Sequence, residues 1–256
     1  MKACLLIPCF DHGQPLRSVL ESLAIFALPC LVVDDGSAPE TQAALARAER
    51  ELSFVRVHRL PKNMGKGIAL AEGYRLAAAG GFTHALQLDA DGQHDVAAVP
   101  DFLEAMLKDP DALVLGQPIF DASAPRARIW ARQLSRAAVW LATLSLEIHD
   151  PLCGMRGVPL ALALRVLDGP PLGPRMEFDP EFAVRCVWAG ARVRNVPVRV
   201  SYPTGGLSHF DIGRDYPAMG ATYAKLWAGM IARAPQLLRA RGARRAQGEL
   251  RARGER

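Results

Sequence analysis

Short apolar runs alternate with amphipathic stretches through the first half of the chain. The runs predict buried strands over residues 3–8, 31–33, 54–57, 85–88 and 112–115. Between them, apolar residues at helical spacing predict helices over residues 16–23, 41–50, 68–79 and 96–107. Strands separated by helices of this length are typical of a parallel sheet covered on both faces. The pattern therefore predicts an α/β fold.

Polar clusters follow four consecutive predicted strands. They read CFDH at residues 9–12, DDGS at 34–37, NMGKG at 63–67 and DADGQH at 89–94. In open α/β sheets, ligands bind beyond the carboxyl ends of the strands. Because four strand ends carry such clusters, we expect a binding site at this edge of the sheet.

Asp89 and Asp91 are separated by one alanine at the end of the fourth run. An aspartate here could cap the helix that begins near residue 96, as part of ordinary turn chemistry. Two neighbouring carboxylates also repel each other unless a cation lies between them, and oxygen ligands favour Mg²⁺ or Mn²⁺. These ions usually complete their shell with water and substrate phosphate oxygens, so the pair predicts a diphosphate substrate.

Two common nucleotide motifs are excluded. A P-loop needs glycine at position 60 and Ser or Thr at position 67, where the chain has Leu60 and Gly67. The turn after the first strand reads PCFDHG, which is not the glycine-rich turn of a dinucleotide-binding fold.

The second half shows fewer clear elements. Arginines at near-helical spacing precede an apolar stretch over residues 137–146, which predicts an amphipathic helix that packs in the core or lies on lipid. Residues 192–201 alternate as a strand does, a glycine-rich loop follows over 202–210, and residues 216–238 predict a second amphipathic helix. The longest apolar stretch has about twelve residues where about twenty are needed to span a bilayer.

The net charge and the cysteines of the chain indicate which partners it binds and in which cell compartment it lies. The chain has 256 residues, a formal net charge of +5 and five cysteines without a C-x-x-C pair, which fits a reducing cytosol. Residues 233–256 hold eight arginines against two glutamates, so the positive charge lies in a terminal tail. Basic residues are not spread over a folded face, so no nucleic acid is expected. The tail is either solvated or attracted to anionic lipid, at the inner face of the membrane.

Four segments together resemble the ordered signatures of the family 2 glycosyltransferases, which have the GT-A fold. They read IPCFDH, VDDGS, NMGKGIA and LDADGQH, and the D-A-D-G-Q-H run is nearest to the polyprenyl-phosphate (dolichol-phosphate mannose synthase-like) branch. The resemblance covers about residues 3–210. It implies a Rossmann-like, mostly parallel sheet in a catalytic domain over 1–215. The nucleotide-sugar half would be 1–118 and the acceptor half 119–215, followed by an amphipathic helix and basic tail over 216–256.

The resemblance also implies roles for the donor side. A nucleotide-sugar donor, a UDP- or GDP-sugar, would bind at Pro8, Asp11, Asp34, Asp35, Ser37, Lys66, Asp89 and His209. Asp11 departs from the family, whose relatives commonly carry Asn there. Asp89 and Asp91 match the metal-binding D-x-D, with Gln93 as a third contact to Mg²⁺ or Mn²⁺, and this makes Asp91 a candidate catalytic residue.

On the acceptor side, the segment DPLCGMRG at 150–157 resembles a family motif below the acceptor site. It implies that Arg156 binds phosphate, with Arg132 as a second candidate; otherwise the segment is a glycine-rich connection. Asp179 resembles the family's catalytic base, which takes a proton from an acceptor hydroxyl, and it could equally be a helix N-cap. An acceptor phosphate would need no base. His209 is either a phosphate contact or a structural histidine.

These observations predict a metal-dependent glycosyltransferase that acts on a lipid or lipid-linked acceptor at the cytoplasmic membrane face. The resemblance alone implies that it is an inverting enzyme. One alternative is a sugar-nucleotide pyrophosphorylase, which normally needs a glycine-rich loop directly after the first strand. The other is a non-catalytic, membrane-associated scaffold, and the intact D-A-D argues against it.

Overall fold

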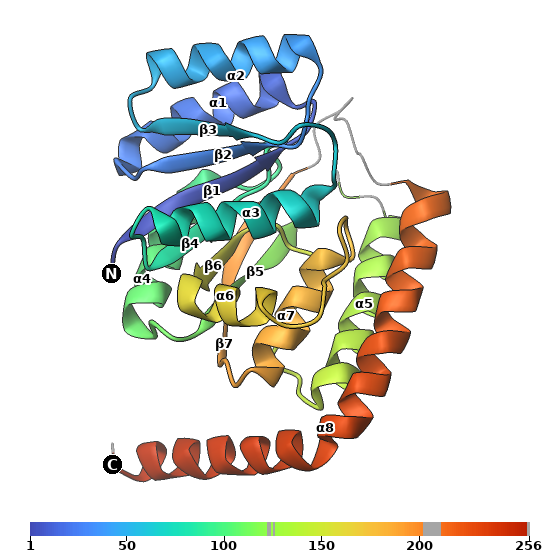
Figure 1. Ribbon diagram of the computed structural model, residues 1–256. Coiled ribbons are helices and arrows are strands. Elements are labelled where there is room, and N and C mark those ends of the chain that lie inside the picture. Colours follow the sequence, from blue (N-terminus) through green and yellow to red (C-terminus); the bar gives the residue numbers. More distant parts are fainter. Residues whose placement is uncertain (122–123, 125, 202–210, 255–256) are drawn as a thin grey trace.

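The computed structural model describes residues 1–121, 124, 126–201 and 211–254. Figure 1 shows a central sheet with helices on both faces and a long helix along one side. The sheet has seven strands in the order β3-β2-β1-β4-β6-β5-β7. The predicted α/β fold class is confirmed.

The first half of the chain forms the regular alternation that its apolar pattern predicts. Its elements are β1 (Ala3–Cys9), α1 (Gly13–Leu23), β2 (Cys30–Asp34), α2 (Pro39–Glu51), β3 (Val55–Arg59), α3 (Lys66–Ala79) and β4 (His84–Gln87). The four strands are parallel, with β1 between β2 and β4. Their carboxyl ends therefore meet at one edge of the sheet.

The second half departs from the predicted parallel alternation at one strand. Its elements are α4 (Val99–Lys108), β5 (Leu113–Phe120), α5 (Arg126–Thr143), β6 (Arg156–Pro159), α6 (Leu160–Leu167), α7 (Phe178–Trp188) and β7 (Val193–Val200). Strand β6 runs antiparallel between β4 and β5, whereas β5 and β7 are parallel. The sequence indicated only a glycine-rich connection at β6, so the sheet is mixed.

Two apolar cores lie on the two faces of the sheet. One is built with α1, α2 and α4, and the other with α3, α5, α6 and α7. In the second core, the rings of Tyr74, Phe178 and Phe182 stack at centroid distances of 5.5 and 5.3 Å. This stack joins α3 to α7 and so places the beginning of both helices near the same strand ends.

The last helix, α8 (Ile212–Gly254), packs along α5 and then changes direction (Figure 1). Trp227 Nε1 donates to the carbonyl of Ala138 on α5 at 3.0 Å, and Arg233 lies over the ring of Trp188. Pro235 follows these contacts inside the helix, and an internal proline is a common cause of helix kinks. The sequence predicts a helix over 216–238 and a separate tail, whereas the helix continues to Gly254. Among the described residues, every helix is too short or too polar to cross a bilayer.

Candidate active site

A cavity of about 1090 Å³ opens at the carboxyl ends of β1, β2 and β4 and extends between α5 and α8. Six of the predicted donor-side residues line it: Pro8, Asp35, Lys66, Asp89, Asp91 and Gln93. On the other side, Arg132 from α5 and Asp179 from α7 also line it. The structure thus brings together segments that are far apart in the sequence.

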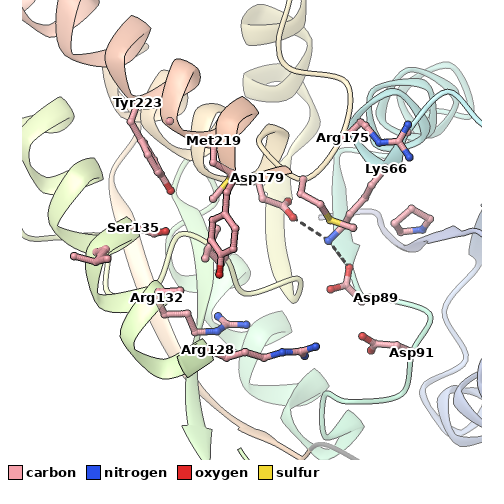
Figure 2. Close-up of a pocket in the computed structure, with 18 of the residues that line it drawn as sticks. Lys66, Asp89, Asp91, Arg128, Arg132, Ser135, Arg175, Asp179, Met219 and Tyr223 are labelled. Carbon is pink, nitrogen blue, oxygen red and sulfur yellow. Dashed lines mark hydrogen bonds and ion pairs between the residues drawn. The ribbon is translucent and has the colours of Figure 1, made fainter. Parts of the chain in front are cut away.

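Lys66 lies at the centre of the polar half, between two carboxylates (Figure 2). Its Nζ is 2.7 Å from Asp89 Oδ1 and 2.8 Å from Asp179 Oδ2. Lys66 is the first residue of α3, Asp89 follows β4 and Asp179 is in the first turn of α7. One ammonium group therefore joins the metal-binding candidate to the candidate base.

The charge states of this triad follow from its contacts. Burial opposes a charged amine, but Asp179 and Asp89 hold the pKa of Lys66 above its usual value. Burial likewise opposes a carboxylate, but Lys66 and His94 hold the pKa of Asp89 below its usual value. Lys66 is therefore a cation and Asp89 an anion at neutral pH.

Asp89 is packed so closely that its neighbour must be glycine. A Cβ at Gly154 would lie 1.9 Å from Asp89 Oδ2. A second glycine holds Lys66: Gly65 has a φ of 104°, and a Cβ there would lie 2.4 Å from the carbonyl oxygen of Pro174. The carboxylate of Asp89 therefore leaves no room for a side chain at position 154, and the carbonyl of Pro174 leaves none at position 65, directly before Lys66.

The acidic pair fits a hard divalent cation only in part. Asp89 and Asp91 both line the cavity and offer oxygen ligands, and Asp91 Oδ1 accepts the backbone N–H of Gln93 at 3.0 Å. Within the described residues, no group of three or more His, Cys, Asp or Glu side chains could hold a metal. The remaining ligands would have to be water or substrate oxygens, as is usual for Mg²⁺.

His94 follows the acidic pair and contacts Cys153, with 3.5 Å between Nε2 and Sγ. Burial opposes a charged imidazole, but Cys153, Asp89 and Asp91 raise the pKa of His94 to about 9. The Gln-His pair that the sequence shows after the D-A-D therefore places further positive charge beside the two carboxylates.

The D-D-G-S segment divides into one cavity residue and two structural residues. Asp35 lines the cavity and accepts the N–H groups of Met64 and Gly65 at 2.7 and 2.8 Å. Burial raises the pKa of Asp35 against the effect of these donors. Asp34 is fully buried, where it accepts from the N–H of Ser37 and from Arg59. The structure therefore places Asp34 beneath the site and not at its surface.

Asp11 and Ser37 tie the first two loops to each other. Asp11 Oδ1 accepts the N–H of Ala38, the residue before α2, at 2.7 Å, and the N–H of Asp11 donates to Ser37 Oγ at 3.0 Å. Neither residue is among those that line the cavity. The carboxylate of Asp11, unusual for the family that the sequence resembles, has this contact to the start of α2.

The two predicted acceptor-side arginines lie in different environments. Arg132 lines the cavity, and its Nη1 donates to both oxygens of Asp150 at 2.8 and 2.9 Å. Arg156 is fully buried and donates to the carbonyls of Cys153, Asp179 and Pro151. Arg156 is not among the residues that line the cavity, and its Nη1 also lies 3.5 Å from Asp179 Oδ1.

Two further predictions concern Asp179 as a helix N-cap and His209 as a phosphate contact. Asp179 is not an N-cap, since Glu177 precedes α7 and Asp179 lies within its first turn. His209 lies outside the described residues. Asp179 is the acidic side chain of α7 that lines the cavity.

Several cavity residues were missed by sequence reasoning. Arg175 lines the cavity from the loop before α7, where the sequence has no recognisable motif. Met219, Tyr223 and Trp227 line it from α8. The sequence shows their helical spacing, but it does not show that they lie at the cavity. Arg128 lies on the same predicted amphipathic helix as Arg132, so its arginine spacing was the available signal.

Comparisons with known proteins agree with this architecture. The profile of a family described as "Glycosyl transferase family 2" matches residues 4–157. Glucosyl-3-phosphoglycerate synthase from Mycobacterium tuberculosis superposes with a TM-score of 0.63 and 18% identity, over 91% of this chain and 80% of that chain. TarS from S. aureus (residues 1–349) gives 0.56 and 15%, over 78% and 60%. The comparison with curated proteins gives no match. At these identities the two structures show a shared GT-A fold.

Proposed function

The chain belongs to glycosyl transferase family 2, and from this premise we propose an inverting, metal-dependent glycosyltransferase that uses a UDP- or GDP-sugar and a lipid or lipid-linked acceptor. The observation that carries the proposal is the contact of Lys66 with both Asp89 and Asp179 beside Asp91. Acidic and basic groups of this kind at the carboxyl ends of parallel strands suit a charged, phosphorylated substrate.

The donor would bind in the polar half of the cavity. Pro8 and Asp35 line its β1 and β2 edge, where the nucleoside would lie, and Lys66 and Arg175 supply positive charge for the diphosphate. Asp89 and Asp91 would hold a Mg²⁺ or Mn²⁺ ion, which supplies a counter-charge to the leaving diphosphate. The synthase from M. tuberculosis has been solved with Mn²⁺ and UDP-glucose, which supports this donor class.

The acceptor would approach from the side of Asp179. If the acceptor group is a hydroxyl, Asp179 would take its proton, and Lys66 Nζ, 2.8 Å from Asp179 Oδ2, would hold the carboxylate in position. If the acceptor group is a phosphate, it is already anionic and Asp179 serves to position Lys66. The resemblance to the polyprenyl-phosphate branch favours the second case.

The proposed function includes a location at the membrane surface. The +6 charge of residues 233–256 and the two adjacent helices α5 and α8 favour attachment to an anionic bilayer at the cytoplasmic face, without insertion. A lipid acceptor would then be available at the surface to which the protein binds. The synthase from M. tuberculosis has been solved in complex with phosphoglyceric acid, so a small phosphorylated acid is the alternative acceptor class.

Release of nucleoside diphosphate tests the proposal. The protein is incubated with UDP-, GDP- and dTDP-sugars, Mn²⁺ and lipid extract, with phosphoglyceric acid as a separate acceptor. We expect release with one donor, its loss in Asp91→Ala and its retention in Asp111→Ala, which alters an exposed aspartate away from the cavity. Release that survives Asp91→Ala would contradict the metal role, and no release from any donor would contradict the function.

A further inference from the structure

We propose that Glu181 on α7 and Lys225 on α8 are positioning residues for the donor, because they hold the segment over residues 169–175, which brings Arg175 to the cavity. The inference rests on the proposed function. It adds that the affinity for the donor depends on how α8 docks, since this helix contributes Lys225.

The 169–175 segment lies over the first turn of α3. The carbonyl of Pro174 accepts the N–H of Gly67 at 2.8 Å. A Cβ at Gly67 would lie 2.6 Å from the carbonyl oxygen of Gly173, so the two backbones touch at this point. Because Gly67 directly follows Lys66, the segment is fixed beside the amine at the centre of the site.

Arg175 extends from this segment on the donor side of the cavity. It lines the cavity, and Figure 2 shows it near Lys66. A Cβ at Gly65 would lie 2.9 Å from Arg175 Cγ, so the stem of the arginine rests on the backbone of Gly65. Burial raises the pKa of Asp35, and the positive charge of Arg175 opposes this rise. The guanidinium therefore acts at the edge of the cavity where the nucleoside diphosphate would bind.

Glu181 holds the segment from the opposite side. This carboxylate is fully buried and does not line the cavity, so the proposed chemistry makes no use of it. Its Oε2 accepts the N–H of Gly173 at 2.8 Å, and its Oε1 contacts Arg185 and lies 2.9 Å from Lys225 Nζ. A buried carboxylate needs such charged partners, because burying an unpaired charge is costly. Glu181 thus joins the segment to α8.

The side chains of Lys225 and Arg185 also bind the segment directly. Lys225 Nζ donates to the carbonyl of Pro171 at 3.2 Å, and Arg185 donates to the carbonyls of Pro170 and Pro171. Proline has a fixed φ, so a short segment with three prolines has few alternative conformations. A displacement of Lys225 would therefore move Arg175 as well. By thermodynamic linkage, donor binding at Arg175 stabilises the docking of α8 by the same amount.

Calorimetry with UDP, GDP and dTDP in the presence of Mn²⁺ tests the inference on the full chain. Arg175→Met should weaken the nucleoside diphosphate that binds by about tenfold, because it removes a hydrogen bond between charged groups. Lys225→Met should weaken it by about fivefold, although Lys225 does not line the cavity. Lys225→Arg, which keeps the charge, should retain wild-type affinity. The matched control is Arg239→Met, at an exposed arginine of the same helix.

The double variant Arg175→Met, Lys225→Met shows whether Lys225 acts through Arg175. We expect it to bind no more weakly than Arg175→Met alone, because the effects of residues in one network do not add. Glu181→Gln keeps an acceptor for the N–H of Gly173 but lacks the charge that binds Lys225, so it should weaken binding as Lys225→Met does. Lys225 is exposed, so its replacement should leave the fold intact, which near-ultraviolet circular dichroism checks. Additive losses, about fiftyfold in the double variant, would overturn the proposal, as would unchanged binding in Lys225→Met.

Failure of this inference is distinguishable from failure of the proposed function. If the wild-type protein binds one of the nucleoside diphosphates and Lys225→Met binds it equally well, the inference is wrong and the function stands. If the wild-type protein binds none of them, the proposed function is wrong, and the inference that rests on it is wrong as well.

Discussion

Lys66 shows how a single side chain can keep an anionic site folded in the absence of substrate. Its ammonium lies between the buried carboxylates of Asp89 and Asp179, and Arg156 Nη1 adds a second positive charge 3.5 Å from Asp179 Oδ1. The contact of Lys66 with Asp89 occupies a carboxylate that would be a ligand of the proposed divalent cation. Binding of a cation at Asp89 therefore competes with Lys66.

Replacing Lys66 tests this competition. In Lys66→Met, we expect the donor-free protein to lose about 3 kcal/mol or more of unfolding free energy, because a buried ion pair is broken. Mn²⁺ should bind about tenfold more tightly, a change of about 1.4 kcal/mol, since no amine competes for Asp89. Calorimetric titration with Mn²⁺ and urea unfolding measure the two effects. Lys62→Met, at an exposed lysine, serves as the control. An unchanged Mn²⁺ affinity would contradict the competition.

At the scale of single residues, the sequence predicts site residues best when the residues that act together are close to each other in the chain. Asp89 and Asp91 are adjacent in the chain, so their spacing alone indicated a shared role. Arg175 was not predicted because it reaches the cavity only when the loop before α7 folds over the start of α3, where the carbonyl of Pro174 accepts the N–H of Gly67 at 2.8 Å. No local pattern records such a contact.

At the scale of elements, a buried carboxylate joins the end of α4 to β7. Asp109 accepts hydrogen bonds from Arg192 and from Arg194, the latter at 3.0 Å. Burial opposes its ionisation, but the two guanidinium groups hold the pKa of Asp109 below its usual value. Because the folded state has the lower pKa, this contact stabilises the protein above the unfolded pKa, about 3.9. The stabilisation is lost as the pH falls through the folded pKa.

The variant Asp109→Asn should therefore show a pH-dependent defect. At pH 7 we expect it to lower the unfolding free energy by about 2 kcal/mol, as is typical for hydrogen bonds to a charged group. At pH 3 the difference between variant and wild type should shrink toward zero. Urea unfolding at both values measures it, with Asp168→Asn, at an exposed aspartate, as the control. A defect of equal size at both pH values would show that ionisation is not its cause.

Elements with a clear period were predicted, whereas strand β6 and helix α6 were not. Strand β6 has four residues, all buried, so no alternation of polar and apolar positions marks it. It contains Gly157 and ends at Pro159, residue types that do not favour a strand. Its place is set by β4 and β5 on either side, which is tertiary information. The antiparallel strand therefore could not be read from the sequence.

At the scale of the whole molecule, the basic end of α8 extends beyond the last described contacts with the body. Residues 239–256 hold seven arginines and two glutamates, a net charge of +5. Each basic residue near an anionic membrane contributes about 1 kcal/mol. Because Arg233 is the last residue with a described contact to the body, removal of 239–256 should leave the fold intact.

Deletion of residues 239–256 should abolish sedimentation with phosphatidylglycerol vesicles at 0.1 M salt. The full chain should sediment with these vesicles, should be released at 0.5 M salt because the attraction is screened, and should not bind neutral vesicles. Near-ultraviolet circular dichroism of the truncated protein checks that it remains folded. Sedimentation that persists after the deletion would assign membrane binding to another surface.

The position of α8 along the chain also has a consequence for biosynthesis. This helix is the last described element to leave the ribosome, and Met219, Tyr223 and Trp227 on it form one wall of the cavity. The sheet and its helices can fold while translation continues, since folding proceeds from the N-terminus during synthesis. A nascent polypeptide would thus have its strand-end carboxylates in place while one side of the pocket was still missing, and it would become competent for transfer only after α8 had been synthesised and had docked.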